Sequence, residues 1–370
     1  MKKILFIINS LRVGGAEKIL IDLLKGIDYK KYDVSLVYFV KGGVFLNDVP
    51  APVHCKCIVG MGSRIDNIFR KIIECFGLLD MYYKWCMRQG VGNYDTIVSY
   101  LEGFPTRMHS YILDKAVRNI SFVHTDLDTF RDSVYQYSHK YTQEMVYSKM
   151  TEIVFVSRHA KESFMKVFPN VVTKQTVLPN FIDKRTIYSQ STEKKIEKRG
   201  FTVVTIGRLA PVKGVDIIPK VAKYIKSKNL PICFNIIGDG SDYNKIKQLI
   251  KENGVDDVVN MAGFQKNPYP YILASDICLN TSYAEGMPLS LCEAMALGRP
   301  VIATNTSGAI ELLDGGYGIL VDRTVEKIAE AIIKLYNNES LRICLAENGV
   351  EFSHRFDRDI YINKFNKLIQ

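Results

Sequence analysis

Short apolar, β-branched segments alternate with longer segments of helical periodicity along the whole chain of 370 residues. The segments that have the length and composition of buried parallel strands are residues 4–8, 34–39, 96–99, 119–123 and 153–156, then 203–206, 233–237, 258–261, 277–279 and 301–303. Helical patterns lie between them at residues 16–24, 106–113 and 158–168, and at 217–226, 243–252 and 289–297. This alternation predicts an α/β protein with two doubly wound sheets.

A polar segment separates the two halves of the pattern. Residues 178–183 have turn chemistry, and residues 184–200 are rich in charged and hydroxyl side chains. We therefore expect an N-terminal Rossmann-like domain at 1–183, a linker at 184–200 and a C-terminal Rossmann-like domain at 201–350. The amphipathic residues 351–370 are expected to form a helix that packs back on the first domain. Two such domains would face a central cleft, because open α/β sheets bind ligands at the carboxyl ends of their strands.

The charge is distributed unevenly between the halves. Lys and Arg number 49 against 39 Asp and Glu, and the first 180 residues hold 24 of the basic and 17 of the acidic side chains. A basic excess in the first half suggests that this half meets an anionic partner. No nucleic-acid-binding motif is present, so we expect no nucleic acid partner.

An amphipathic segment from Arg64 to Gln89 offers one explanation for the basic excess. Its apolar residues recur at helical spacing: Ile65, Ile68, Phe69, Ile72, Ile73, Phe76 and Leu79. The basic residues among them and the bulky residues that follow are Arg64, Arg70, Lys71, Lys84 and Arg88, and Met81, Tyr82, Tyr83 and Trp85. Such a helix could lie on an anionic membrane surface. It could equally be a core helix with solvated charges, which Asp66, Glu74 and Asp80 would favour.

The sequence gives no sign of export or of a structural metal. The first apolar segment is too short for a secretory signal, and no apolar stretch approaches the roughly 18 residues that span a bilayer. Eight cysteines are too few for a disulfide scaffold, and no second pair complements Cys55 and Cys57 as metal ligands. We expect a cytoplasmic protein with reduced thiols.

Two cations follow the first strand of the second half. Gly207 and Arg208 come directly after residues 203–206, and Lys213 and Gly214 follow five residues later. Arginine offers a bidentate fork to a phosphate and lysine a point charge, so these residues could hold a diphosphate. Surface charge on a loop is the equally acceptable alternative.

Two glutamates bracket the start of a predicted helix. Glu285 lies in a loop after a strand, Pro288 opens the helix and Glu293 lies one turn inside it. The free N–H groups of residues 289–291 would point at a ligand and would favour a phosphate. Two solvated glutamates are the commoner case for this spacing, but the surrounding Gly-Met-Pro and helix start make that alternative weaker.

In their order along the chain, these motifs resemble those of the retaining GT-B glycosyltransferases of family 4 (group 1). The segments that carry the resemblance are Gly207-Arg208-Leu209 with Lys213-Gly214, Gly238-Asp239-Gly240, Ala262-Gly263-Phe264, Glu285 to Glu293, and Gly298-Arg299-Pro300. It covers nearly the whole chain, because Gly14-Gly15 after the first strand and residues 178–183 resemble the family's N-terminal loop and domain boundary. Phe181 stands where a glycine is usual in that boundary motif.

The resemblance implies a role for each matching residue. Glu285 and His124 would be the catalytic residues that contact the donor sugar, and Arg208 and Lys213 would hold the diphosphate. The other donor-binding residues would be Gly14, Gly15, Gly263, Phe264, Gln265, Gly286, Met287, Pro288, Leu289 and Glu293. Within this set, Glu293 would bind the nucleotide ribose, and residues 263–265 would line the base pocket. No metal is implied, because the two cations would supply the positive charge.

The function implied is transfer of a hexose or N-acetylhexosamine from a nucleoside-diphosphate sugar, expected to be a UDP-sugar, with retention at the anomeric carbon. The expected acceptor is a lipid-linked saccharide in surface polysaccharide biosynthesis, met by a peripheral protein on the cytoplasmic membrane face. Two alternatives stay open, a soluble acceptor or a non-catalytic GT-B partner subunit of another transferase. A non-catalytic subunit would be expected to lose the cations or the glutamates that are present here.

Overall fold

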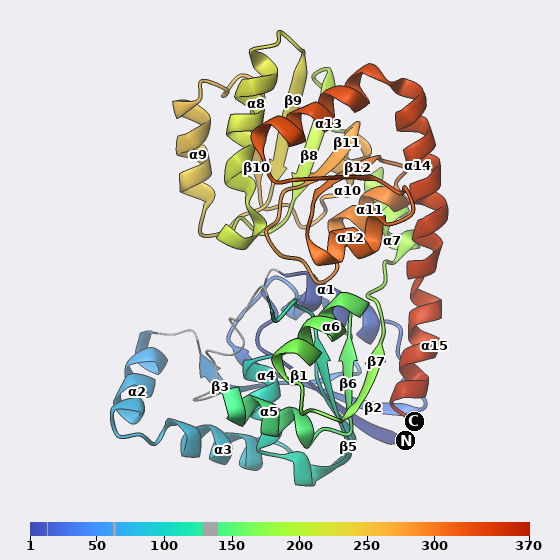
Figure 1. The fold of residues 1–370 in the computed structure, drawn as a ribbon. Coiled ribbons are helices and arrows are strands. Elements are labelled where there is room, and N and C mark those ends of the chain that lie inside the picture. The colour runs from blue at the N-terminus through green and yellow to red at the C-terminus, as the bar shows by residue number, and fades with distance from the viewer. Residues whose placement is uncertain (13, 62–63, 129–139) are drawn as a thin grey trace. The chain divides into compact units, whose positions relative to one another are not determined.

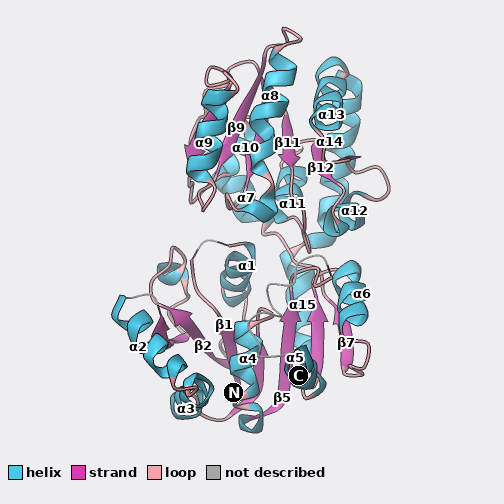
Figure 2. Cartoon of the chain, turned by 60° about the vertical axis from the view of Figure 1, so that its left-hand side comes forward, coloured by secondary structure: helices cyan, strands magenta, loops and turns pink. Residues whose placement is uncertain are grey.

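The computed structural model describes residues 1–12, 14–61, 64–128 and 140–370, which form two compact units (Figure 1). Unit 1 consists of Met1–Pro179 together with Tyr361–Gln370, and unit 2 of Asn180–Ile360. Each unit is built on a parallel sheet with helices on both sides of the strands (Figure 2). The two Rossmann-like sheets predicted from the alternating pattern are therefore present.

The sheet of unit 1 has seven parallel strands in the order β3-β2-β1-β4-β5-β6-β7. The strands are β1 (Lys2–Ile8), β2 (Tyr32–Val40), β3 (His54–Met61), β4 (Tyr94–Ser99), β5 (Ala116–Val123), β6 (Glu152–Phe155) and β7 (Lys174–Val177). Residues 4–8 of β1 are fully buried, because helices cover both faces of a parallel sheet. The order reverses between β1 and β4, the point at which such sheets bind ligands.

The helices of unit 1 include one from the far end of the chain. They are α1 (Gly15–Leu24), α2 (Arg64–Cys75), α3 (Leu79–Gly90), α4 (Phe104–Ser110), α5 (Lys140–Ser148), α6 (Arg158–Val167) and α15 (Arg358–Leu368). Phe365 of α15 is fully buried, with its ring centroid 5.9 Å from that of Phe6 and 6.4 Å from that of Phe122. The C-terminal helix thus packs on the first domain, as predicted.

The sheet of unit 2 has six parallel strands in the order β10-β9-β8-β11-β12-β13. The strands are β8 (Phe201–Ile206), β9 (Ile232–Ile237), β10 (Val259–Gly263), β11 (Ile277–Asn280), β12 (Val301–Thr304) and β13 (Ile319–Val321). The helices are α7 (Lys184–Ser191), α8 (Ile218–Lys226), α9 (Tyr243–Glu252), α10 (Tyr269–Leu273), α11 (Leu289–Ala296), α12 (Ser307–Leu313), α13 (Val325–Asn337) and α14 (Glu339–Ser353). Alternate residues of the strands feed two separate hydrophobic clusters, one on each face of the sheet.

The segment expected to be a linker, residues 184–200, differs in the structure. Its first part forms α7, which packs against α10 and α11 of unit 2. The Asp183 side chain caps this helix by accepting a hydrogen bond from the Thr186 N–H at 3.2 Å. Ile187 is buried within the unit 2 core, so one apolar anchor and a cap hold an otherwise polar segment in place.

The amphipathic segment 64–89 is likewise two helices rather than one. Gly77 separates α2 from α3 in a left-handed conformation with φ 66°, which a side chain would disfavour. None of the described helices is long and apolar enough to cross a membrane.

Candidate active site

The two motifs of the second half meet because their strands are neighbours. β8 and β11 pair in parallel, with Ile277 opposite Val203, so the loops after both strands lie at the same edge of the sheet. The loop after β8 carries Lys213 in the short 3-10 turn Pro211–Lys213. The loop after β11 carries Glu285 and leads into α11.

Lys213 and Glu285 form an ion pair across this edge. The Lys213 Nζ lies 2.6 Å from Glu285 Oε1, and the two side chains are 29% and 9% exposed. Ser282 Oγ and Asn280 Nδ2 also donate to Glu285 Oε1, at 2.6 and 3.2 Å. Burial alone would raise the pKa of this carboxyl group, but the Lys213 ammonium and these hydrogen bonds bring the pKa below its usual value. Glu285 is therefore an ionised, fixed carboxylate.

Arg323, which the sequence motifs did not single out, links the two loops. Its Nε donates to the Thr281 carbonyl at 3.0 Å and its Nη2 to the Gly214 carbonyl at 2.8 Å. Its guanidinium lies 3.8 Å from the centroid of the Tyr283 ring and also forms an ion pair with Asp216 at 3.1 Å. The sequence held a weak signal, because Arg323 follows the last strand of the sheet by two residues.

Gly214 is required by the close approach of these loops. It adopts a left-handed conformation with φ 57° and ψ 25°. A Cβ atom at this position would lie 2.5 Å from the Thr281 carbonyl oxygen and 2.7 Å from Arg323 Nε. A glycine at position 214 therefore lets the lysine loop and the glutamate loop touch.

Arg208 lies apart from the ion pair. It is exposed in the loop after β8, and it forms no ion pair with any residue that the structure describes. The backbone on either side is fixed, because Gly207 N–H donates to the Ile237 carbonyl and Leu209 N–H to the Asp239 carbonyl. The structure thus places a cation with an uncommitted head group near the end of β8.

The start of α11 offers N–H donors at the same edge. Pro288 is its N-cap residue and supplies no side-chain cap. Leu291 N–H donates to the Pro288 carbonyl, so of the three N–H groups expected to be free only those of Leu289 and Ser290 lack an intrahelical acceptor. Gly286 and Met287 lie in the preceding loop, which packs tightly on α12: a Cβ atom on Gly308 would lie 2.6 Å from the Gly286 carbonyl oxygen.

The structure does not join Glu293 or residues 263–265 to the ion pair. Glu293 lies inside α11, is 6% exposed, and accepts a hydrogen bond from the Tyr269 hydroxyl at 3.3 Å. Gly263 ends the edge strand β10, and its carbonyl accepts from the Gly238 N–H at 2.8 Å. Phe264 is 38% exposed, and Gln265 donates to the Ala262 carbonyl.

The candidates of the first half lie at the carboxyl ends of β1 and β5 in unit 1. Gly14 is the N-cap of α1 in extended conformation, and Gly15 begins the helix. A Cβ atom on Gly14 would lie 1.9 Å from Glu17 Oε2, so the Glu17 carboxylate already lies at this helix start. His124 follows β5, with its ring stacked on Phe122 at a centroid distance of 6.1 Å.

His124 is neutral in this environment. Glu102, which the sequence analysis did not identify, binds the backbone of His124. Burial lowers the pKa of His124 to about 4, although a hydrogen bond to the Tyr100 backbone opposes the shift. Its backbone N–H donates to Glu102 Oε2 at 2.8 Å, and the neighbouring Thr125 hydroxyl donates to Glu102 Oε1 at 2.7 Å. Burial raises the pKa of Glu102. Glu102 follows the end of β4 by three residues, and this position was the one sequence feature that could have indicated it as a site residue.

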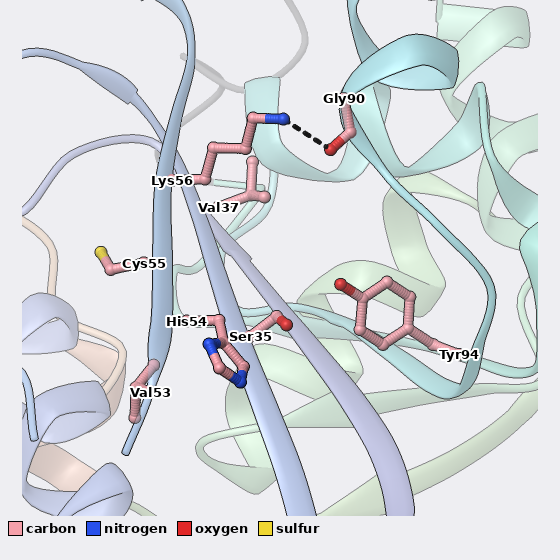
Figure 3. A pocket seen from close by; sticks show the side chains of 8 residues that line it. All are labelled: Ser35, Val37, Val53, His54, Cys55, Lys56, Gly90 and Tyr94. Atoms are coloured by element: carbon pink, nitrogen blue, oxygen red, sulfur yellow. Dashed lines mark hydrogen bonds between the residues drawn. The ribbon is translucent and has the colours of Figure 1, made fainter. Parts of the chain in front are cut away.

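An open pocket of unit 1 lies away from these residues. It has a volume of about 520 Å³ and is lined by residues of β2 and β3 together with Gly90 and Tyr94 (Figure 3). Lys56 and His54 line it, and the Lys56 ammonium donates to the Gly90 carbonyl at 3.2 Å. His54 begins β3, so the pocket is not at the carboxyl end of that strand, and no predicted site residue lines it.

Comparison with known proteins agrees with this architecture. Residues 188–352 match the family model for glycosyl transferases group 1. Across the whole chain the structure superposes on HepE of Anabaena in complex with UDP-glucose, with a TM-score of 0.77 and 19% identity, covering 100% of this chain and 99% of that one. The fold is GT-B. Unit 2 contains the whole of the group 1 segment, and with it Lys213, Glu285 and Glu293.

Two curated relatives differ in how much they cover. An uncharacterized glycosyltransferase of Methanocaldococcus jannaschii is 29% identical over 209 residues, which are 55% of this chain and 55% of that relative. The chain thus spans about half of that relative's length. The UDP-Gal:alpha-D-GlcNAc-diphosphoundecaprenol alpha-1,3-galactosyltransferase of Escherichia coli is 24% identical over 383 residues, covering 95% of this chain and 94% of that protein.

Proposed function

We propose that this chain is a retaining glycosyltransferase of family 4, which moves a hexose or N-acetylhexosamine from a UDP-sugar to a saccharide acceptor. The observation that carries the proposal is the Lys213–Glu285 ion pair, with its 2.6 Å separation, at the sheet edge where α11 begins. It combines a cation, an ionised carboxylate and free helix N–H groups at one point. The cation and the N–H groups are suited to bind a diphosphate, and the carboxylate is suited to bind a sugar.

The chemistry follows from the charges that develop during the reaction. Breaking the bond between sugar and diphosphate leaves negative charge on the diphosphate and positive charge on the sugar ring. Arg208, Lys213 and the α11 N–H groups would stabilise the first charge, and the Glu285 carboxylate would lie near the second. Glu293 would accept hydrogen bonds from the ribose hydroxyls. Residues 263–265 would line the base pocket.

The first half would contribute Gly14, Gly15 and His124, as the family resemblance implies. Because His124 is neutral down to about pH 4, it would contact the sugar through hydrogen bonds rather than as an acid. The retention of anomeric configuration is part of the proposal. Glu285 is the one carboxylate assigned to the sugar here, so no glycosidase-like carboxylate pair is invoked.

The acceptor that we propose is a lipid-linked saccharide in surface polysaccharide assembly. The support comes from the Escherichia coli relative, whose name specifies a UDP-sugar and a diphosphoundecaprenol acceptor. With such an acceptor the enzyme would work as a peripheral protein at the cytoplasmic face of a membrane. Arg208, Lys213, Glu285 and Glu293 are all present in this chain. A non-catalytic subunit would be expected to lack some of them, so their presence disfavours that alternative.

The test is transfer of label from a panel of nucleotide sugars to membranes that carry polyprenyl-diphosphate saccharides. We expect label to enter the organic phase with one UDP-sugar. Donor hydrolysis without a lipid product would support a transferase with a soluble acceptor instead. If neither transfer nor hydrolysis occurs although UDP binds, the chain would be a non-catalytic partner subunit.

Metal removal tests the proposed charge arrangement. Because Arg208, Lys213 and the start of α11 are proposed to neutralise the diphosphate, we expect transfer to continue after dialysis against EDTA. The measurement is the initial rate with and without added Mg²⁺. A rate that falls on dialysis and returns with Mg²⁺ would contradict metal independence.

A further inference from the structure

Helices α2 and α3 and the turn between them expose large apolar side chains to solvent. We name these six residues the α2–α3 ridge: Ile68, Ile72, Phe76, Leu78, Met81 and Trp85. The exposed fractions reach 74% for Phe76, 68% for Met81 and 62% for Trp85. Both helices lie at the outer edge of unit 1 in both views (Figures 1 and 2). Exposed apolar residues gathered in 18 consecutive positions indicate an interaction surface.

The core of unit 1 does not explain the ridge. α3 faces that core with other residues, since Tyr83 and Met87 are 2% and 0% exposed. The Tyr83 ring packs edge-on against Phe104 at a centroid distance of 5.3 Å. Trp85 and Met81 are four residues apart and lie on a different stripe of the same helix. The fold therefore uses one apolar stripe of α3 and leaves a second one uncovered.

The turn between the helices holds their apolar stripes in a fixed relation. Gly77 N–H donates to the Glu74 carbonyl at 2.9 Å, and Leu78 N–H donates to the Ile73 carbonyl at 3.1 Å. This pair of hydrogen bonds, with a left-handed glycine, is a Schellman helix end. Phe76 and Leu78 lie on either side of Gly77, so the ridge is continuous along the chain through a rigid corner.

The charges beside the ridge are mainly positive. Lys71 and Lys84 are exposed. Asp80 is already bound by Arg107 at 2.7 Å, and Asp66 lies 3.7 Å from the Lys41 ammonium. Glu74 is the remaining carboxylate of the two helices. An apolar ridge with cations beside it is complementary to a surface that is apolar within and anionic at its boundary.

We infer that the α2–α3 ridge inserts into the interface of an anionic lipid bilayer, with Lys71 and Lys84 on the headgroups. The inference rests on the proposed lipid-linked acceptor for its purpose, and it names the membrane partner of that reaction. Insertion would hold unit 1 at the surface where such an acceptor is found. Trp85 would lie at the level of the headgroups, where an indole ring is both apolar and a hydrogen-bond donor.

Trp85 reports on this insertion directly, because it is the only tryptophan in the chain. Its emission is recorded as vesicles of phosphatidylcholine and phosphatidylglycerol are added to the full-length protein. We expect a shift to shorter wavelength, quenching by lipids with brominated acyl chains, and a weaker response to pure phosphatidylcholine vesicles. Unchanged emission together with no co-sedimentation would overturn the inference.

Paired variants separate the ridge from exposed apolar residues in general. The double variant Phe76→Ser with Met81→Ser is expected to lower the vesicle partition coefficient more than about tenfold. The control is Val172→Ser with Ile343→Ser, two exposed apolar residues outside the ridge, and it should bind vesicles as the wild type does. Equal loss in both double variants would contradict a specific role for the ridge.

A charge variant tests the second half of the inference. Lys71→Gln with Lys84→Gln should weaken binding to the anionic vesicles about 25-fold, or about fivefold for each lysine. Binding to pure phosphatidylcholine should change little. Equal binding of the charge variant and the wild type to anionic vesicles would overturn the proposed headgroup contacts.

The remaining alternative is a second copy of the chain on the ridge. Sedimentation velocity without lipid would then show a dimer that Phe76→Ser with Met81→Ser dissociates, and this result would overturn membrane insertion. Because vesicle binding is measured without donor or acceptor, it is independent of turnover. Normal insertion with no glycosyl transfer would refute the proposed function alone.

Discussion

At the scale of single residues, Lys213 and Glu285 test the proposed chemistry. Their separation of 2.6 Å makes each the main partner of the other. Removing a group that stabilises charge only in the transition state costs about 10²- to 10³-fold in kcat. We expect this loss from Lys213→Ala and from Glu285→Gln, measured as initial rates at saturating donor.

The activity of the double variant, compared with the two single variants, shows whether Lys213 and Glu285 act together. If the two residues act as a unit, the double variant should lose no more than about as much as either single variant. Lys220→Ala is the matched control, because Lys220 is an exposed lysine of the same unit on α8. Wild-type activity in Lys213→Ala would reject the site assignment.

A buried histidine makes the stability of unit 1 depend on pH. His109 on α4 is fully buried, with its ring nitrogens 3.1 Å from Ser99 Oγ and 2.9 Å from Asn119 Oδ1. Burial lowers its pKa to about 4. The unfolded chain therefore binds more protons than the folded one between pH 6.5 and pH 4, and stability falls as the pH falls through that window. We expect the contribution of His109 to lower the free energy of unfolding by about 2 kcal/mol at pH 5 relative to pH 7.

Urea unfolding followed by Trp85 emission measures this effect in unit 1. His109→Gln should reduce the difference between pH 7 and pH 5 without abolishing it, because the pKa of His124 is lowered for the same reason. A variant with the full wild-type pH dependence would show that His109 is not responsible.

At the scale of elements, Arg323 holds the two loops of the candidate site together. Its hydrogen bonds to the Gly214 and Thr281 carbonyls need the planar fork of an arginine, which lysine does not provide. We expect both Arg323→Gln and Arg323→Lys to weaken UDP binding about tenfold or more, measured by calorimetry. Loosened loops would then also lower the rate of transfer.

The control is an arginine with similar bonds elsewhere in unit 2. Arg342 on α14 donates to the Leu335 and Tyr336 carbonyls at 2.5 and 2.9 Å, at the end of α13. Arg342→Gln should destabilise the unit and leave UDP affinity unchanged. If both arginine variants bind UDP equally well, Arg323 is only a structural residue.

At the scale of the whole molecule, the C-terminal helix α15 packs against the sheet of unit 1. Phe365 is fully buried beside Phe6, and the Lys2 ammonium donates to the Gln370 carbonyl at 3.0 Å. Phe365→Ala should lower the free energy of unfolding of unit 1 by about 3–5 kcal/mol. The measurement is urea unfolding followed by Trp85 emission, although the substitution lies 280 residues away in sequence.

Ile360→Ala is the control for this substitution. Ile360 belongs to the same helix but is 45% exposed, so its truncation should cost little. Equal destabilisation by both variants would mean that α15 contributes through its helix as a whole rather than through the Phe365 contact.

The interior strands could be predicted from the sequence, and most of the edge strands could not. The predicted strands were confirmed at β1, β2, β4, β5, β6 and β8 to β12. The missed strands are β3, β7 and β13, each at an edge of its sheet. An edge strand is partly exposed and carries polar residues, as in Lys174–Val177, so it lacks the continuous apolar run that marks a buried strand.

The candidate site was predictable to the level of its loops. Glycines, cations and carboxylates directly after strands indicate the functional edge of a parallel sheet, and the order of the motifs along the chain carries the resemblance to group 1 glycosyltransferases. Arg323 and Glu102 were missed because their partners lie in loops that are distant in the sequence. The place of Arg323 two residues after a strand is a weak signal, and it does not reveal that its partners are carbonyl oxygens 42 and 109 residues away.

The sequence by itself determined the alternation of strands and helices and the residue types at the strand ends. Burial on both faces demands apolar strands, and the close approach of two loops, as at Gly214, demands glycine. Only the tertiary structure decided that Lys213 meets Glu285, that Arg323 joins their loops, and that one stripe of α3 is core while another is exposed. These outcomes depend on the pairing of β8 with β11 and on which face of a helix its neighbours cover. Such choices are made by contacts between residues far apart in the chain, which a linear pattern does not contain.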